Sequence, residues 1–294
     1  MKSGFVSIIG RPNAGKSTLL NSLLSDKLAI TSPKAQTTRN SITGILNEKD
    51  YQIVFVDTPG VHTPKTSLGV YMNKEALNQV EGADVIYYLV DGKTGIRNED
   101  KDILDRLFKS YSNIFLLINK IDEINKDKLI ERLSYASRIY KFAEIIPISA
   151  LNKDNLDELL KTTISYLKDN VRYYPEDINN TSSKEFKIVE TIREKILLNL
   201  DEEVPHLCAV KIINIEEKEN KIDIEADIIV NKDSHKAILI GKKGSMLKKI
   251  NTSSIISLKK LFNKKVNLST FVKVDEDWIN SDKKLFELGY FIEK

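Results

Sequence analysis

The segment 10–17 limits what this chain can fold into more than any other part of its sequence. Its residues, GRPNAGKS, fit the pattern G-x-x-x-x-G-K-[ST], between an apolar run at 5–9 and helical spacing at 16–25. Glycines let backbone N–H groups turn toward phosphate oxygens, and the helix N-terminus adds partial positive charge. A chance glycine-rich turn is the alternative. We expect phosphate binding by Gly10, Arg11, Pro12, Asn13, Ala14, Gly15, Lys16, Ser17 and Thr18.

Apolar runs of strand length recur along the first half of the chain. They lie at 51–56, 84–90, 114–118 and 144–148, and amphipathic stretches at 70–80, 98–110, 126–140 and 153–169 separate them. Continuous apolar runs are typical of parallel strands that are buried on both faces. The first half, 1–171, is therefore predicted to be an α/β domain: a mostly parallel sheet with helices on both faces.

Two features of the phosphate-binding loop and of the next apolar run predict a bound magnesium nucleotide. Lys16 can reach the β- and γ-phosphates, and the Ser17 hydroxyl can ligate Mg²⁺. The run at 51–56 leads into Asp57, Thr58, Pro59 and Gly60. Asp57 can hold Mg²⁺ through water, and the Gly60 N–H can meet the γ-phosphate. Taken alone, this tetrapeptide also fits a surface turn.

The ends of the last two apolar runs indicate that the nucleotide carries guanine. Asn119, Lys120 and Asp122 follow the run at 114–118, and Ser149 and Ala150 follow the run at 144–148. A buried Asp122 carboxylate would accept hydrogen bonds from N1–H and the exocyclic amine of guanine. The Lys120 stem can cover the base, and a backbone N–H at 149–150 can donate to O6. Ligands of open α/β sheets bind at these carboxyl ends of strands.

Composition excludes several other classes of protein. The chain has 294 residues and a formal net charge of +3, with one Cys and three His. These numbers exclude a disulfide scaffold and a multi-Cys/His zinc site, and a single thiol fits a reducing cytosol. No apolar run approaches the ~18 residues that span a bilayer, and the apolar stretch of the opening segment is too short for a signal peptide. The length suggests two domains.

A second domain is predicted after a polar linker at 172–184. Helical patterns at 185–200, 234–240 and 245–262 and strand patterns at 207–215, 221–230 and 266–274 predict a small α+β domain over 185–294, with a C-terminal extension. Gly241, Lys242, Lys243 and Gly244 lie between two of these helices. This order resembles the type II KH fold, whose GxxG loop clamps single-stranded RNA. A helix hinge is the alternative for GxxG alone.

The charge distribution in the second half supports RNA binding. Residues 232–265 carry ten lysines and one acidic residue, whereas 171–231 carry 8 basic and 14 acidic groups. A merely solvated lysine-rich face is the alternative. Trp278 is interpreted as either a base-stacking residue or a core residue. The residues predicted to bind RNA are Ile240, Gly241, Lys242, Lys243, Gly244, Lys248 and Lys249.

The chain resembles the translation-factor-related bacterial GTPases in the order of its motifs, which are the phosphate loop, Thr37-Thr38-Arg39, DTPG, NKID and SA. The segment 34–39, KAQTTR, and the C-terminal half resemble the Era family. The resemblance implies GTP and GDP as ligands, with Thr38, or alternatively Thr37, completing a Mg²⁺ shell of Ser17 and Asp57. It also implies a potassium ion beside Asn13. The implied RNA is the 3′ end of small-subunit (16S) ribosomal RNA, and the implied role is maturation of the 30S subunit. We expect a cytoplasmic monomer with peripheral contact to the inner membrane face.

Hydrolysis is expected to be slow. Val61 stands where Ras-type GTPases carry the Gln that orients the attacking water. His62 is interpreted as a substitute base or as a solvated loop residue. The residues predicted to serve catalysis are Lys16, Thr38, Gly60 and Asn13. Two alternatives remain: a constitutive RNA-binding module with a vestigial GTPase, and a GTPase of tRNA modification or large-subunit assembly.

Overall fold

The computed structural model describes residues 1–25, 28–30, 34 and 37–290. The chain divides into two compact units. The first combines Met1–Pro64 with Met72–Thr181, and the second combines Lys65–Tyr71 with Ser182–Lys294. Within the described residues, no helix is long and apolar enough to cross a bilayer.

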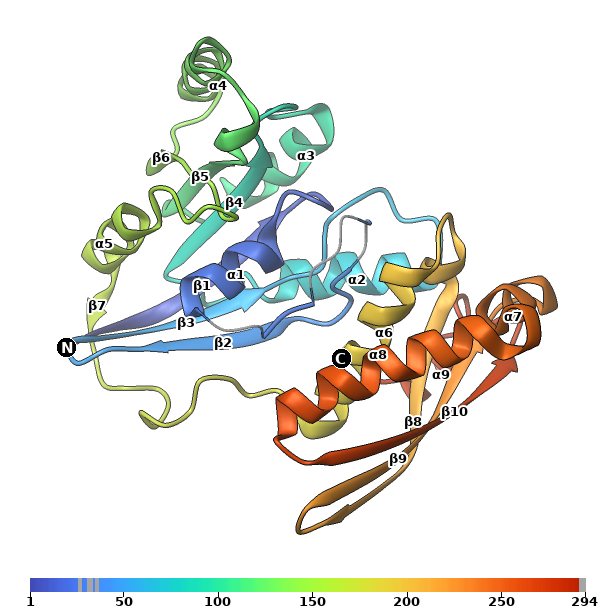
Figure 1. Cartoon of the computed structure of the whole chain (residues 1–294). Helices are drawn as coiled ribbons and strands as arrows, with labels where there is room; N and C mark the ends of the chain where they lie inside the picture. Colours follow the sequence, from blue (N-terminus) through green and yellow to red (C-terminus); the bar gives the residue numbers. More distant parts are fainter. Residues whose placement is uncertain (26–27, 31–33, 35–36, 291–294) are drawn as a thin grey trace. The chain divides into compact units, whose positions relative to one another are not determined.

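The first unit is built on one sheet with the strand order β2-β3-β1-β4-β5-β6, and β7 pairs with β1 (Figure 1). The strands are β1 (Lys2–Gly10), β2 (Ile42–Asn47), β3 (Tyr51–Asp57), β4 (Val85–Asp91), β5 (Ile114–Asn119), β6 (Glu144–Pro147) and β7 (Lys168–Asp169). The pairs β3-β1, β1-β4, β4-β5 and β5-β6 are parallel. The predicted mostly parallel α/β sheet is therefore confirmed.

Helices cover both faces of this sheet, as predicted. They are α1 (Lys16–Leu24), α2 (Ser67–Asn78), α3 (Asn98–Leu107), α4 (Lys126–Ile139) and α5 (Leu156–Tyr166). Side chains alternate between the faces of a strand, so Tyr87 and Tyr88 of β4 point in opposite directions. Tyr88 joins a buried cluster with residues of α2, α3 and α4. Tyr87 stacks on Phe115 and hydrogen-bonds to Thr163 of α5.

The edge strand β2 was not predicted from the sequence. It pairs antiparallel with β3, from Ile42 opposite Asp57 to Asn47 opposite Gln52. Its free edge meets the segment predicted as a linker, because the Ile45 N–H donates to the Asn179 carbonyl at 2.8 Å. Gln52 Nε2 also donates to the Tyr174 carbonyl at 2.8 Å. This part of the segment 172–184 therefore lies along the first unit, where it satisfies polar groups at the sheet edge.

The second unit contains a sheet with the order β10-β9-β8. Its elements are α6 (Lys184–Asn199), β8 (Cys208–Lys218), β9 (Lys221–Val230), α7 (Asp233–Ile240), α8 (Ser245–Phe262), β10 (Lys265–Val274) and α9 (Asp282–Glu287). As predicted, β8 and β9 form an antiparallel hairpin, while β10 runs parallel to β9. Alternate residues of β9, such as Ile222 and Ile224, join Ile192 of α6 and Ile250 of α8 in a buried core.

Candidate functional site

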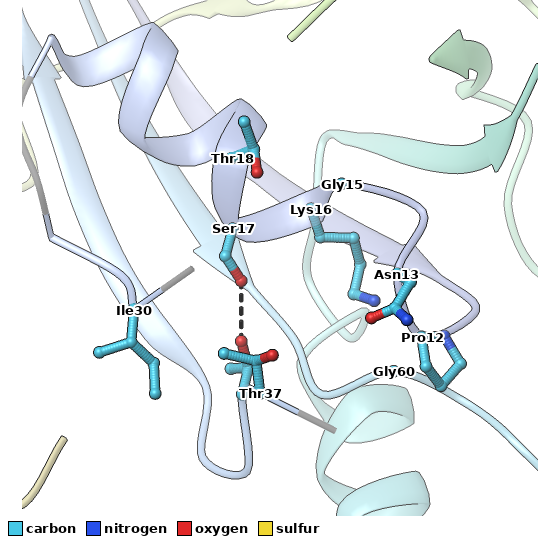
Figure 2. Close-up of a pocket in the computed structure, with 10 residues that line it drawn as sticks. Pro12, Asn13, Gly15, Lys16, Ser17, Thr18, Ile30, Thr37 and Gly60 are labelled. Atoms are coloured by element: carbon cyan, nitrogen blue, oxygen red, sulfur yellow. Dashed lines mark hydrogen bonds between the residues drawn. The ribbon is translucent and has the colours of Figure 1, made fainter. Parts of the chain in front are cut away.

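The predicted phosphate-binding loop connects β1 to α1 and lines a pocket (Figure 2). Gly15 caps α1 with φ of 100°, in the left-handed region, and a Cβ there would overlap the Asn119 amide. Gly60 meets the loop from the opposite side, because a Cβ at this position would lie 2.8 Å from Pro12 Cα. The left-handed backbone at Gly15 and the close approach of the Pro12 backbone at Gly60 thus favour glycine at both positions. The residues that line the pocket are Pro12, Asn13, Gly15, Lys16, Ser17, Thr18, Ile30, Thr37, Thr38 and Gly60.

Lys16 is held inside the curve of the loop. Its Nζ donates to the Gly10 carbonyl at 3.0 Å and to the Arg11 carbonyl at 3.1 Å, and the residue is only 6% exposed. Burial lowers the Lys16 pKa to about 8, although the nearby Asp57 charge opposes that shift. A buried ammonium group that lines a pocket beside the start of a helix suits a phosphate ligand.

Asp57, at the end of β3, brings together the oxygen atoms of three predicted metal-site residues. Its Oδ2 accepts from Ser17 Oγ at 2.7 Å and from Thr38 Oγ1 at 3.3 Å. The two hydroxyls lie 2.8 Å apart, and the dashed line in Figure 2 starts at the Ser17 hydroxyl. Among the described residues, Asp57 Oδ1 is buried without a hydrogen-bond partner. Hard oxygen donors around an unsatisfied carboxylate oxygen fit a Mg²⁺ site.

The electrostatics of Asp57 agree with that assignment. Burial raises its pKa to about 6, although the Lys16 charge and the Ser17 and Thr38 hydroxyls act in the opposite direction. A carboxylate that is costly to ionise in an apolar environment is stabilised by a bound cation.

The two candidate threonines lie differently. Thr38 is 5% exposed and contacts Ser17 and Asp57, whereas Thr37 Oγ1 donates to the Lys34 carbonyl at 2.8 Å. Ala35 and Gln36, which carry part of the family resemblance, lie outside the described residues. The geometry favours Thr38 as the third metal ligand.

The residues after Asp57 attach this strand end to its neighbours. Thr58 Oγ1 donates to the Ile8 carbonyl at 2.8 Å, and Pro59 is buried. Val61 is 8% exposed, and its N–H donates to the Gly10 carbonyl at 3.2 Å. His62 is tied to α2, because Asn73 accepts from its N–H and donates to its carbonyl. The backbone of His62 is therefore hydrogen-bonded on both sides, and the residue is partly exposed.

Asn119 joins the segment 119–122, the predicted base-recognition segment, to the phosphate loop. Its Nδ2 donates to the Ala14 carbonyl at 2.8 Å, and its Oδ1 accepts from the Ala150 N–H at 2.9 Å. Ser149 Oγ donates to Asp122 Oδ1 at 2.5 Å. The carboxyl ends of β5 and β6 thus bring the predicted guanine-binding residues together.

The expectation of a buried Asp122 is wrong. Asp122 is exposed: β5 ends at Asn119, Lys120 adopts the left-handed region with φ of 63°, and Asp122 lies in the 3₁₀ turn Ile121–Glu123 that follows. Lys120 Nζ instead pairs with Asp91 Oδ2 at 2.8 Å. Asp91 was not predicted as a functional residue, nor was Asp100, which accepts a hydrogen bond from Arg11. Asp91 ends the apolar strand β4, and Asp100 stands in the polar start of α3, but neither belongs to a recognisable motif.

In the second unit, the predicted RNA-binding loop lies between α7 and α8. Gly241 has φ of 71°, and a Cβ there would lie 2.7 Å from Met246 Cβ. Gly244 has φ of 78° with nothing within 4 Å of such a Cβ, so its surface is open to an approaching backbone. Between them, Lys242 and Lys243 are exposed. Ile240, the last residue of α7, is partly buried.

The lysines of this region differ in their partners. Lys248 and Lys249, in the first turns of α8, are exposed like Lys242 and Lys243. Lys264 is instead paired with Glu217 at 2.7 Å. Trp278 is fully buried and donates from its indole N–H to the Leu207 carbonyl at 3.3 Å, which favours the core interpretation over base stacking.

Comparison with known families matches both halves of the chain. The family of 50S ribosome-binding GTPases matches residues 5–120, and the KH domain family matches residues 203–279. GTPase Era of Clostridium kluyveri is 47% identical over 291 residues, which cover 99% of each protein. GTPase Era of Clostridium acetobutylicum is 47% identical over 289 residues, which cover 98% of each.

Two solved structures resemble the whole chain. A variant of Aquifex aeolicus Era bound to GDP·AlF₄⁻ has a TM-score of 0.96 at 38% identity, covering 99% of this chain and 100% of that one. The structure of Era in complex with MgGDPNP and nucleotides 1506–1542 of 16S ribosomal RNA has the same TM-score, identity and coverage. The two family matches and the similarity over nearly the full length of the chain show that it belongs to the Era family of GTPases.

Proposed function

We propose that this GTPase binds the 3′ region of small-subunit ribosomal RNA through its KH domain and acts in maturation of the 30S subunit. The observation that carries the proposal is the set of exposed lysines at the GxxG loop. Lys242, Lys243, Lys248 and Lys249 form no ion pair among the described residues, so all four charges can meet RNA phosphates. The related Era complex with 16S ribosomal RNA supports the choice of RNA.

In this proposal the pocket of the first unit binds GTP and GDP. The backbone of the loop 10–18 and Lys16 hold the phosphates, and Asp122, Lys120 and Asn119 recognise guanine. Ser17, Thr38 and Asp57, whose side-chain oxygens contact one another, would hold Mg²⁺. When bound, the metal neutralises charge on the phosphate oxygens. The MgGDPNP in the related Era complex supports this assignment.

Hydrolysis proceeds by in-line attack of water on the γ-phosphate. Thr38 and the Gly60 N–H position that phosphate, while Lys16 stabilises charge that develops on its oxygens. The buried Val61 side chain has no group that could orient the water, so intrinsic turnover is slow. Asn13, which lines the pocket beside Lys16 (Figure 2), would help to hold a potassium ion. Loss of the γ-phosphate contacts then relaxes the Thr38 segment.

The test is single-turnover GTP hydrolysis with and without an RNA that carries the 3′ end of 16S ribosomal RNA, in potassium and in sodium buffers. We expect slow hydrolysis that potassium and this RNA accelerate. No hydrolysis in any buffer, with RNA binding intact, would favour the vestigial GTPase instead. Crosslinking in cells tests the partner directly, since crosslinks confined to tRNA or the large subunit would refute this choice of RNA.

The GxxG assignment is tested by the double variant Lys242→Asp/Lys243→Asp. We expect RNA affinity to fall by about 100-fold, because two phosphate contacts become repulsive, while GDP affinity stays unchanged. The matched control is Lys109→Asp/Lys161→Asp, which makes the same change in net charge at two exposed lysines of the first unit. Equal RNA affinity of the two double variants would remove the loop from the RNA site.

The proposal includes the cellular setting that the family resemblance implies. The protein is then a cytoplasmic monomer that associates peripherally with the inner face of the cell membrane. Sedimentation of the purified protein and fractionation of cells, with and without a salt wash, test both points. A stable dimer, or a protein absent from the membrane fraction at low salt, would contradict them.

A further inference from the structure

Arg11 belongs to the phosphate-binding loop, but its side chain leaves the nucleotide pocket. Its Nε donates to Asp100 Oδ2 at 2.8 Å, and one terminal nitrogen donates to Thr94 Oγ1 at 3.0 Å and to the Gly95 carbonyl at 3.1 Å. Arg11 is not among the described residues that line the pocket. Its guanidinium therefore contacts α3 and the segment 92–97 that precedes it, which we name the β4–α3 loop.

Asp100 is built into the core as the acceptor for this arginine. It is fully buried, and its oxygens accept from Arg11, from the Arg97 N–H at 2.7 Å and from the Tyr88 hydroxyl at 2.9 Å. Burial, with the adjacent Asp100 charge, raises the Tyr88 pKa, so this hydroxyl remains a donor. Removing one member of a buried charged pair leaves the other uncompensated. The Arg11–Asp100 pair is thus a strong attachment of the phosphate loop.

The other end of the β4–α3 loop is attached to the base-recognition segment. Asp91, the residue before the loop, accepts from Lys120 Nζ at 2.8 Å and from the Lys93 N–H at 2.8 Å. The Gly92 N–H donates to the Asn119 carbonyl at 2.7 Å. Burial opposes ionisation of Asp91, yet the hydrogen bond and charge of Lys120 lower its pKa overall. The ion pair therefore holds the lysine that is proposed to cover guanine.

A third contact holds the first half of the β4–α3 loop. Arg132 of α4 donates to the Gly92 carbonyl at 3.3 Å and to the Lys93 carbonyl at 2.8 Å. A Cβ at Gly95 would lie 2.8 Å from Arg132 Cδ, so the arginine lies directly against the loop. A loop that is held from Gly92 to Gly95 can transmit a displacement of one attached segment to the other.

We propose that the β4–α3 loop is a brace that couples the phosphate-binding loop to the guanine-recognition segment, with Arg11, Asp100 and Asp91 as positioning residues. The inference rests on the proposed nucleotide site. The Arg11 guanidinium and the Asp100 carboxylate act without touching the nucleotide: they hold the loop whose backbone meets the phosphates. Asp91 holds Lys120 in the same way. Loosening either attachment misaligns both parts of the site.

The first test measures the Kd and the dissociation rate of fluorescent GDP for Arg11→Lys, Asp100→Asn and Asp91→Asn. We expect each Kd to rise about tenfold, mainly through faster dissociation, because a buried charged contact behind the site is broken. Asp102→Asn is the matched control, since Asp102 is exposed on the same helix as Asp100. Arg11→Lys keeps the charge but loses the fork that reaches both Asp100 and Gly95, so it tests the brace if Asp100→Asn does not fold.

A second measurement separates a brace from a merely structural role. IDP lacks the exocyclic amine of guanine, so the ratio of the IDP and GDP Kd values reports base recognition alone. We expect Arg11→Lys, a change on the phosphate side, to reduce this ratio about threefold. We also expect the double variant Arg11→Lys/Asp91→Asn to lose less GDP affinity than the product of the losses of the two single variants. An unchanged ratio together with multiplicative losses would overturn the brace. Absence of GDP binding by the native protein would instead refute the proposed nucleotide site.

Discussion

The loops 10–17 and 241–244 use similar local structure in opposite surroundings. Each places a glycine with positive φ at the start of a helix and carries lysine. In the first loop, Lys16 is buried, and the Asp57 carboxylate beside it is fully buried as well. In the second, Lys242 and Lys243 are exposed, and nothing lies within 4 Å of a Cβ placed at Gly244.

The difference determines what each loop can select. Buried charges interact strongly with a ligand that fits them, because little water screens the contact, but they destabilise the protein until that ligand binds. Exposed lysines destabilise the fold little and attract any polyphosphate, so selectivity must come from the shape of the surrounding surface. The first loop is thus suited to one compact nucleotide, and the second to the backbone of a long chain. Four predictions test this contrast.

The largest expected effect is the loss of GDP affinity in Lys16→Ala. Removing a buried ammonium group that contacts phosphate should weaken GDP binding on the order of 10³-fold, since charge-assisted hydrogen bonds are lost in a site that excludes water. RNA affinity should not change. Lys242→Ala is the matched control, with the same substitution at an exposed lysine, and equilibrium titration with fluorescent GDP measures both. A loss below tenfold for Lys16→Ala would show that burial adds no selectivity.

Asp122→Asn tests whether the first site reads a base as well as phosphates. The carboxylate accepts from guanine, whereas an amide also donates, so GDP binding should fall by about 100-fold and xanthosine diphosphate should become the better ligand. Competition titrations with the two nucleotides measure the change. Asp127→Asn, at an exposed residue in the first turn of α4, is the control. Unchanged preference for guanine would refute the role of Asp122.

The sequence predicts the frame of the first site well because buried parallel strands appear as continuous apolar runs, and each site motif follows one of them. It does not predict β2, whose residues, ITGILN, contain a glycine and pair only at the sheet edge. The Arg11–Asp100 pair joins residues 89 positions apart, and nothing in the polar start of α3 distinguishes Asp100 from its neighbours. Asp122 was expected to be buried because the strand before it is, but β5 ends at Asn119 and Asp122 lies in the 3₁₀ turn that follows.

A rise in salt concentration should weaken RNA binding more than GDP binding, and this difference should be smaller than the effects of the two substitutions above. If four lysines each meet one phosphate of single-stranded RNA, RNA affinity should fall by about 50-fold between 50 and 200 mM salt. GDP affinity should fall only about fourfold, because the buried site exchanges few ions with solvent. Titrations at four salt concentrations give both slopes, and Lys248→Ala should reduce the RNA slope alone. Equal slopes for the two ligands would contradict the contrast in burial.

The smallest expected effect is a pH-dependent destabilisation that Asp57 introduces into the nucleotide-free protein. Its folded pKa, about 6, lies above its ordinary value of 3.8, so ionisation is harder in the folded state. The carboxylate therefore destabilises the fold progressively as pH rises from about 4 to about 6, and fully above that range. Asp57→Asn removes this contribution, so its stability relative to the native protein should rise by about 1–2 kcal/mol across that interval. Native-state hydrogen exchange of β3 amides measures the difference, and Asp50→Asn, at an exposed residue just before β3, should show no such rise. A difference that is flat with pH would mean that the buried carboxylate does not destabilise the empty site.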